Sequence, residues 1–323
     1  MRSLVRLFCL SLLVAAFALM AGCQSANQGG GSASSTTSTS STGKRIGVTL
    51  LTREHEFYRD LEAGLKDAAD KQGYQLTVTS GDFDLAKQQS QIENFVVQKM
   101  DAIIVCPADS KGIGPAIEQA NSAGIPVFTA DIAAQSGRVV SHVASDNLAG
   151  GRLAADFIAR AIGGEGSVGI IGQQELQTGL DRENGFKEEL AAKHPNIKVV
   201  AVLNGGGVRD RSLKAAEDML QGNSAIKAIF GINDDSALGA LSAAEASGRK
   251  DLVIVGYDAT PEAVKAIQRG SQLKADVAQQ PRELGAKTID VIRTHFAGGQ
   301  SPANISVPVK IVDAESLKAS GGQ

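Results

Sequence analysis

Short apolar runs rich in β-branched residues alternate with longer stretches of helical periodicity from Lys44 almost to the end of the chain. Continuous apolar runs of this kind are typical of parallel strands that helices cover on both faces. Strands are predicted at 45–51, 75–79, 102–106, 126–129, 167–171, 198–203, 228–231, 252–256 and 273–277. Helices are predicted at 57–71, 85–98, 148–161, 182–192, 209–220, 236–246, 261–268 and 282–296. This order predicts an α/β fold.

Nine predicted strands are more than one open sheet of ordinary width usually holds. A polar step at Ser145-Asp146-Asn147 interrupts the apolar rhythm near the middle of the series. About 280 residues can bury two cores of about 140 residues each. The sequence therefore predicts two doubly wound parallel-sheet lobes, the second beginning near Asp146.

The first 22 residues have the pattern of an export signal. Arg2 and Arg6 precede an apolar run at 7–20, which ends in small residues. The run is shorter than the roughly 20 residues that a spanning helix needs, so we expect it to be removed. Met20-Ala21-Gly22-Cys23 resembles the bacterial lipoprotein signal, although Leu is usual where Met20 stands. That resemblance implies cleavage before Cys23 and lipidation of its thiol; the alternative is an ordinary secretory signal with an incidental cysteine.

Residues 23–43 are predicted to be a tether. Beyond Cys23 they are almost wholly Ser, Thr, Gly, Ala, Gln and Asn, which cannot build an apolar core and behave as flexible coil. A diacylglycerol on Cys23 would bury many methylenes at about 0.8 kcal/mol each, which is enough for anchoring without a spanning helix. We therefore expect an exported lipoprotein, periplasmic or on the cell surface, held to the membrane by its N-terminal lipid alone.

Cysteine content and charge bear on two further questions, whether the folded part contains a disulfide and whether it binds nucleic acid. Cys9 lies in the signal and Cys23 at the anchor, so Cys106 is the single thiol of the folded part and no intrachain disulfide can form there. We interpret Cys106 as a small buried apolar residue. The net charge is −3 and the basic residues are scattered, a pattern that predicts no nucleic-acid partner.

No pattern of an enzyme is found. The glycine runs at 163–166 and 205–207 do not have the G-x-G-x-x-G spacing of a dinucleotide cradle. The four histidines are well separated, and no H-E-x-x-H or G-x-S-x-G motif occurs. We therefore predict no catalytic residues, no cofactor and no metal.

Polar and aromatic side chains follow the predicted strands at their carboxyl ends, where open α/β sheets bind ligands. They are Phe57, Tyr58, Asp131, Asn233, Asp258 and Gln279. Carboxylates and amides hydrogen-bond the hydroxyls of sugars, and aromatic faces pack against the C–H side of the ring. Taken singly, the aspartates could be helix caps or turn residues, Asn233 a cap, and the two aromatics part of the core. Their recurrence at successive strand ends favours a binding site.

The segments 139–147, 233–240 and 255–261 resemble the ribose-binding type of periplasmic sugar-binding proteins, which serve ABC importers, and the resemblance extends from Arg45 to about Val312. It implies that the six residues above line the ligand site. It also implies three chain crossings between lobes, near 145–146, 279–280 and 307–310. The N-terminal lobe would then comprise 44–145 and 280–308, and the C-terminal lobe 146–279 and 309–323.

Two departures from that pattern weigh against ribose itself. Arginines are expected directly after the site aspartate and later in the chain, where this sequence has Ile132 and Leu180. Without these two arginines the site has fewer hydrogen-bond donors, unless Arg53, His55 or Arg209 replaces them. A further departure is His55, which stands where an asparagine is expected.

The sequence therefore predicts a monomeric, non-enzymatic protein that captures a monosaccharide or sugar-like polyol between two lobes and delivers it to an ABC permease. The alternative is a sensor that presents the same ligand to a chemotaxis or signalling receptor. A repressor of the same fold would need a DNA-reading helix-turn-helix where this chain has its signal and tether.

Overall fold

The computed structural model describes residues 43–319 and residue 321. The predicted signal peptide, Cys23 and all of the predicted tether except Gly43 lie outside this range, as do Ser320 and the last two residues of the predicted C-terminal lobe. Within the described range, no helix has both the length and the apolar character that a membrane span requires.

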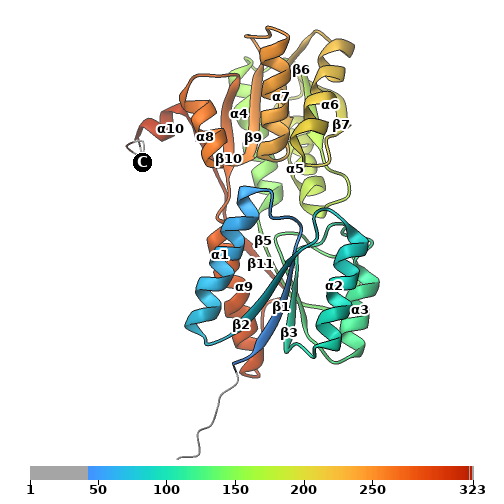
Figure 1. The fold of residues 1–323 in the computed structure, drawn as a ribbon. Coiled ribbons are helices and arrows are strands. Elements are labelled where there is room, and N and C mark those ends of the chain that lie inside the picture. The colour runs from blue at the N-terminus through green and yellow to red at the C-terminus, as the bar shows by residue number, and fades with distance from the viewer. Residues whose placement is uncertain (1–42, 320, 322–323) are drawn as a thin grey trace, which may run out of the picture. The chain divides into compact units, whose positions relative to one another are not determined.

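The first sheet contains six parallel strands in the order β11-β5-β4-β3-β1-β2. Its strands are β1 (Arg45–Leu50), β2 (Gln75–Ser80), β3 (Ala102–Val105), β4 (Val127–Ala130), β5 (Val139–Ser145) and β11 (Asn304–Val307). Helices α1 (Glu56–Lys71) and α9 (Pro281–Phe296) pack together on one face, and α2 (Leu85–Val97) and α3 (Gly114–Ser122) cover the other (Figure 1). These elements are the N-terminal lobe.

The second sheet also has six strands, in the order β12-β10-β9-β8-β6-β7, and β12 alone runs antiparallel. Its strands are β6 (Gly166–Gly172), β7 (Ile197–Asn204), β8 (Ile226–Gly231), β9 (Val253–Asp258), β10 (Leu273–Ala278) and β12 (Lys310–Asp313). Helices α4 (Asn147–Ala161) and α5 (Gln177–Lys193) cover one face; α6 (Arg209–Gly222), α7 (Asp234–Ala246) and α8 (Pro261–Gln268) cover the other. With the terminal α10 (Ala314–Ala319), these elements are the C-terminal lobe.

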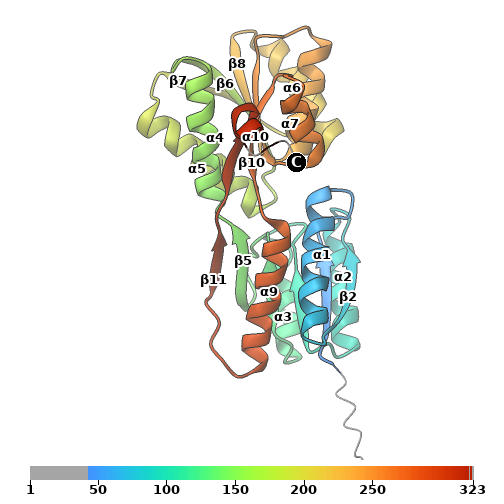
Figure 2. The same ribbon diagram turned by 90° about the vertical axis from the view of Figure 1, so that its left-hand side faces the viewer.

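The chain passes between the two sheets three times. The passages lie between β5 and α4, between β10 and α9, and between β11 and β12; the last two are visible side by side in Figure 2. The predicted fold class, two doubly wound α/β lobes joined by three segments, is confirmed.

Local sequence explains why the elements begin where they do. Asp84 caps α2 and Asp146 caps α4, each accepting a hydrogen bond from the backbone N–H three residues on. Helices α8 and α9 begin at prolines, whose fixed φ suits the first helical turn. All four residues of β3 and of β4 are buried, which is the reason these strands appear as unbroken apolar runs.

Five elements were not predicted from the apolar pattern. Strand β5 carries Ser141 and His142, whose polar atoms bond within the lobe, to the Pro302 carbonyl at 2.7 Å and the Thr129 hydroxyl at 2.9 Å. Such internal pairing lets a mixed sequence occupy a buried strand. The edge strands β11 and β12 have only four residues each, and α10 has six, none of them buried. Helix α3 begins with Gly-Pro, which is more typical of a loop.

Candidate functional site

The binding residues gather where the strand order of each sheet reverses. Successive strands lie on opposite sides of β1 in the first sheet and of β6 in the second, so the loops that follow their carboxyl ends open into a crevice. A small cavity lies there and is lined from both lobes. Its lining residues are Leu51, His55, Phe57, Tyr58, Asp131, Gln173, Leu176, Thr178, Arg182, Ile232, Asn233, Asp258 and Gln279.

Seven of the eight ligand-binding residues that the sequence predicts line this cavity. The exception is Arg53, which lies outside it. Its guanidinium makes two hydrogen bonds to the Glu62 carboxylate, at 2.7 and 2.9 Å, and one to the Val78 carbonyl at 3.1 Å. Because these bonds hold Arg53 at the surface of the N-terminal lobe, it does not replace the hydrogen-bond donors of the two expected arginines.

The N-terminal lobe contributes an aromatic pair and a carboxylate. The Tyr58 hydroxyl donates to Oδ2 of Asp131 at 2.6 Å, and the Phe57 ring meets the Tyr58 ring edge-on with centroids 5.1 Å apart. Asp131 adopts φ 65°, which is uncommon for a non-glycine residue. Its Oδ1 is buried without a partner among the described residues, and burial raises the pKa of this carboxyl. Asp131 therefore has a free acceptor inside the cavity.

The C-terminal lobe contributes a second carboxylate, held by the amide of Gln279. Gln279 Nε2 donates to Oδ1 of Asp258 at 2.6 Å, whereas Gln279 Oε1 is buried and has no partner in the described structure. Burial raises the pKa of Asp258 to about 8. Asp258 has φ 122° and the next residue, Ala259, φ 54°, so the loop after β9 holds two consecutive residues in left-handed conformations.

Asn233 has two roles at once. Its Oδ1 accepts from the Ser236 N–H at 2.9 Å, which caps α7, and its Nδ2 donates to the Gly207 carbonyl at 3.0 Å. The cap interpretation of Asn233 is thereby confirmed. Since an amide can make four hydrogen bonds, the same side chain still has capacity toward the cavity that it lines.

Arg182 lines the cavity although its position did not match the expected arginine. Its side chain is buried; Nε donates to Asn147 Oδ1 at 2.8 Å and Nη1 to the Ile232 carbonyl at 2.7 Å. The guanidinium carbon lies 3.7 Å from the centre of the Tyr257 ring, and Nη1 lies 3.9 Å from Asp258 Oδ1. An arginine of the C-terminal lobe therefore lies at the cavity, although Leu180 occupies the position where the resemblance places one.

The signal for Arg182 was the helical spacing. Thr178 and Arg182 are four residues apart on α5 and so lie on the same face, and both line the cavity. Gln173, which follows β6, was also missed because it falls in a segment without a motif.

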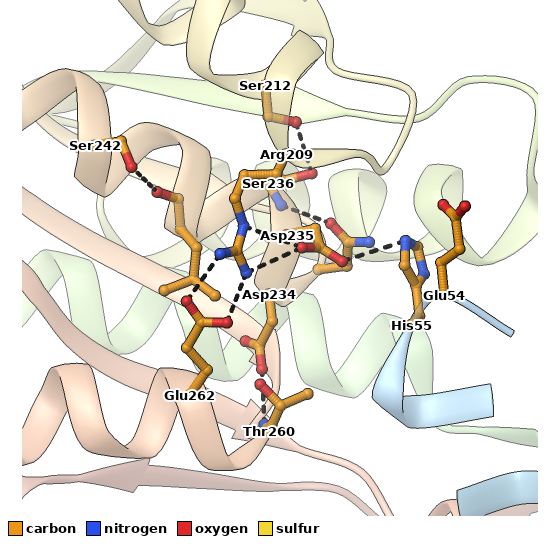
Figure 3. A network of polar contacts seen from close by, with 12 residues as sticks. Glu54, His55, Arg209, Ser212, Asp234, Asp235, Ser236, Ser242, Thr260 and Glu262 are labelled. Carbon is orange, nitrogen blue, oxygen red and sulfur yellow. Dashed lines mark hydrogen bonds and ion pairs between the residues drawn. The ribbon is translucent and has the colours of Figure 1, made fainter. Parts of the chain in front are cut away.

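Direct contacts join the lobes around the cavity. His55 Nε2 lies 3.2 Å from Oδ2 of Asp235, whose other oxygen accepts from Arg209; Figure 3 shows Asp235 between the two. Burial lowers the pKa of His55, which disfavours the charged form of its imidazole. The Ser110 hydroxyl accepts from the Gln177 N–H at 3.0 Å. The two lobes are thus closed on each other.

Two further side-chain features concern reactivity. Cys106 is fully buried, and burial raises the pKa of its thiol well above the usual range, which confirms its interpretation as a small buried residue. Among the residues that the structure describes, no cluster of three or more His, Cys, Asp or Glu side chains could hold a metal ion.

A protein-family model and a related protein each match most of this chain. Residues 46–300 match the periplasmic binding protein domain. The ribose import binding protein RbsB of Escherichia coli K12 is 34% identical over 268 residues, which cover 83% of this chain and 90% of that protein.

Two solved structures are similar in fold and sequence. An ABC transporter periplasmic solute-binding protein from Actinobacillus succinogenes 130z with bound D-allose has a TM-score of 0.79 and 28% identity, covering 85% of this chain and 99% of that one. An ABC transporter solute-binding protein from Bacillus halodurans C-125 with bound myo-inositol has a TM-score of 0.79 and 27% identity, covering 88% and 99%.

Proposed function

Because this chain belongs to the periplasmic binding protein family, whose members bind and do not catalyse, we propose that it captures a neutral monosaccharide or sugar-like polyol between its lobes. It then delivers that ligand to an ABC importer. The observation that carries the proposal is a cavity lined from both lobes, in which buried acceptors of Asp131 and Gln279 have no partner in the described structure.

The arrangement of acceptors favours hydroxyl groups. A buried polar atom without a hydrogen bond costs roughly 1–3 kcal/mol, so a ligand that donates to Asp131 Oδ1 and Gln279 Oε1 recovers that cost. Phe57 and Tyr58 offer aromatic surface for the apolar C–H groups of the same molecule. A polyol supplies both the donors and the C–H groups.

The charges around the cavity favour a neutral ligand. Asp131 and Asp258 face it from opposite lobes, and Arg182 is the single arginine among its lining residues. An anionic sugar acid would meet two carboxyl groups with one guanidinium already bonded to Asn147 and Ile232, so its charge would be poorly compensated. Sugar acids should therefore bind much more weakly than the corresponding neutral sugars.

The names of the relatives support a compact ligand of this class, since they report ribose, D-allose and myo-inositol. The replacement of an expected arginine by Ile132, which is fully buried, favours a ligand other than ribose.

Closure is the proposed mechanism. The N-terminal lobe (44–145 and 280–308) supplies the aromatic pair and Asp131, and the C-terminal lobe (146–279 and 309–323) supplies Asn233 and Asp258. A ligand contacts both sets only when the lobes meet, so it binds the closed state more tightly and shifts the population toward it. The closed surface is what an importer would recognise.

We also propose that the mature protein is a monomeric lipoprotein, exported and anchored through Cys23. The signal pattern before Cys23 and the polar segment after it support this proposal.

A thermal-shift screen tests the function directly. The panel should pair neutral pentoses, hexoses, sugar alcohols and inositols with their acids, such as glucose with glucuronate. A true ligand at 100 times its dissociation constant adds about 2.7 kcal/mol to the free energy of unfolding. We expect at least one neutral compound to raise the melting temperature and its acid to have little effect. A screen in which only acids or no carbohydrates stabilise the protein would refute the proposal.

A further inference from the structure

Two buried carboxyl groups meet beneath the loop that carries Asp258. Asp276 lies on β10, in register with Gly256 on the neighbouring strand β9, and Asp234 is the first residue of α7. A Cβ atom placed on Gly256 would lie 2.3 Å from Oδ2 of Asp276 and 3.0 Å from Oδ1 of Asp234. The two carboxyl groups therefore lie over the same glycine, and only a residue without a side chain leaves room for them.

Each carboxyl group holds one backbone N–H of the site loop. Asp276 Oδ1 accepts from the Ala259 N–H at 2.8 Å, and Asp234 Oδ2 accepts from the Thr260 N–H at 2.7 Å; the second pair is visible in Figure 3. These are the two residues that follow Asp258. Asp258 has φ 122° and Ala259 φ 54° in the loop conformation that presents Asp258 to the cavity. The hydrogen bonds to the two acidic side chains thus hold the loop in this conformation.

The remaining two oxygens face each other. Asp234 Oδ1 and Asp276 Oδ2 are both buried beside Gly256, and neither has a hydrogen-bond donor among the described residues. Two ionised carboxylates cannot hydrogen-bond, whereas one proton between them satisfies both oxygens. Burial raises the pKa of Asp276 to about 7 and that of Asp234 well above its usual range, the latter further because of Asp276.

We propose that Asp234 and Asp276 share one proton, and that this proton-sharing pair is a positioning device that holds the 258–260 loop in its binding conformation. Loss of the proton would leave two adjacent buried carboxylates, which repel each other and release the Ala259 and Thr260 amides. The consequence for affinity rests on the proposed function, because it assumes that Asp258 binds the ligand. We call the hydrogen bonds from this pair to the Ala259 and Thr260 amides the clamp; it can be measured without any ligand.

No neighbouring cation among the described residues bridges Asp234 and Asp276 in place of the shared proton. The ionisable groups that act on the pair from neighbouring elements are Asp258 at the end of β9 and Arg182 on α5, and Asp131 of the other lobe acts on Asp258. The guanidinium of Arg182 is already bonded to Asn147 and to the Ile232 carbonyl, so it does not bridge the two acids. On the other side, Asp234, Asp258 and Thr260 line a cavity together with Glu54, His55, Arg59, Arg209, Asp235 and Glu262. Arg209 is paired with Asp235 and Glu262 there, so it does not bridge the two acids either.

Amide hydrogen exchange of Ala259 and Thr260, followed by NMR on the ligand-free protein from about pH 6 to about pH 10, tests the clamp. After correction for intrinsic exchange, protection of both amides should fall by up to tenfold for each pH unit until the pH reaches the pKa of the shared proton, and should level off above it, because opening releases a proton only while the closed pair still holds one. Protection that is independent of pH in the wild-type protein would overturn the proposal.

The matched variant is Asp276→Asn. Asparagine can still accept from the Ala259 N–H, and its Nδ2 donates permanently to Asp234, so the bonds remain without a titrating proton. Protection in Asp276→Asn should change less than twofold across the same range. Glu189→Gln removes a buried carboxylate that pairs with Lys193 on α5 and should keep the wild-type slope. An equal slope in Asp276→Asn, or a flattened one in Glu189→Gln, would refute the assignment.

The effect on the site is measured with the same proteins and named probes, D-allose and myo-inositol. For a probe that binds, the affinity of the wild type should fall at alkaline pH in parallel with the loss of protection, whereas that of Asp276→Asn should not. If neither probe binds, the proposed function is weakened, but the exchange profiles still decide for or against the clamp. If a probe binds with an affinity that stays constant while the two amides lose protection, the positioning role is refuted.

Discussion

Replacing Asp258 with asparagine should change ligand affinity and protein stability in opposite directions. Asparagine keeps the shape of the side chain, and its Oδ1 can still accept the 2.6 Å hydrogen bond from Gln279. Its second group is an NH2 without acceptor capacity, however, whereas the corresponding oxygen of a carboxyl group can accept from a ligand hydroxyl whether or not it carries the proton. An unsatisfied buried hydroxyl costs roughly 1–3 kcal/mol, so Asp258→Asn should weaken binding about 5- to 150-fold.

The stability of the ligand-free protein should rise at neutral pH. The pKa of Asp258 is raised from 3.8 to about 8, so the folded protein holds a proton that the unfolded chain has released. Stability is then lost as the pH increases from about 4 to about 8, by at most about 1.4 kcal/mol per pH unit. At pH 7 the loss is at most about 4 kcal/mol, and asparagine, which does not titrate, removes it.

The assay combines urea unfolding at pH 5 and pH 7 with calorimetric titration of the best ligand from the screen. Asp251→Asn is the matched control, because the Asp251 side chain is 70% exposed, is paired with Arg249 and lies before the start of β9, at the opposite end of the strand from Asp258. The control should leave both affinity and pH dependence unchanged. Unchanged affinity in Asp258→Asn would refute its place in the site, and an unchanged pH slope would refute the cost of burying its charge.

Three further predictions follow from single contacts. Asn233→Ala should weaken binding and also lower stability by about 1 kcal/mol in urea unfolding, because it removes the cap of α7; a variant with normal affinity would exclude Asn233 from the site. Cys23→Ala should release the protein from membranes or block its processing, and mass spectrometry that found a free, unacylated thiol at the wild-type N-terminus would contradict the anchor. Burial lowers the pKa of His142 to about 4, so stability should fall as the pH drops from about 6.5 to 4, an effect absent from His142→Gln; equal acid profiles would contradict it.

The sequence predicted best the strands whose two faces are both buried. The central strands were predicted because both of their faces are apolar, as in Ile103 and Ile104 of β3, which are fully buried. Strand β5 was not, because Ser141 and His142 find hydrogen-bond partners that lie far away in the chain or on the next strand. Tertiary pairing of this kind leaves no local pattern.

The same limit applies to the site. Strand ends identify which loops face the cavity, since parallel strands deliver them to one edge of the sheet. They do not give the direction of a long side chain. Arg53 lies three residues after the end of β1, yet it pairs with Glu62, whereas Arg182 reaches the cavity from the second turn of α5. Spacing alone could not distinguish these two arginines, because ion-pair partners decide where each one points.

The central claim is that a ligand closes the two lobes, and small-angle X-ray scattering with and without a binding ligand tests it most directly. Because the site is divided between the lobes, saturating ligand should reduce the radius of gyration while far-UV circular dichroism stays constant, which indicates hinge motion without refolding. A radius of gyration that does not change at saturation would mean that ligand does not drive closure, and would contradict the proposed mechanism of delivery.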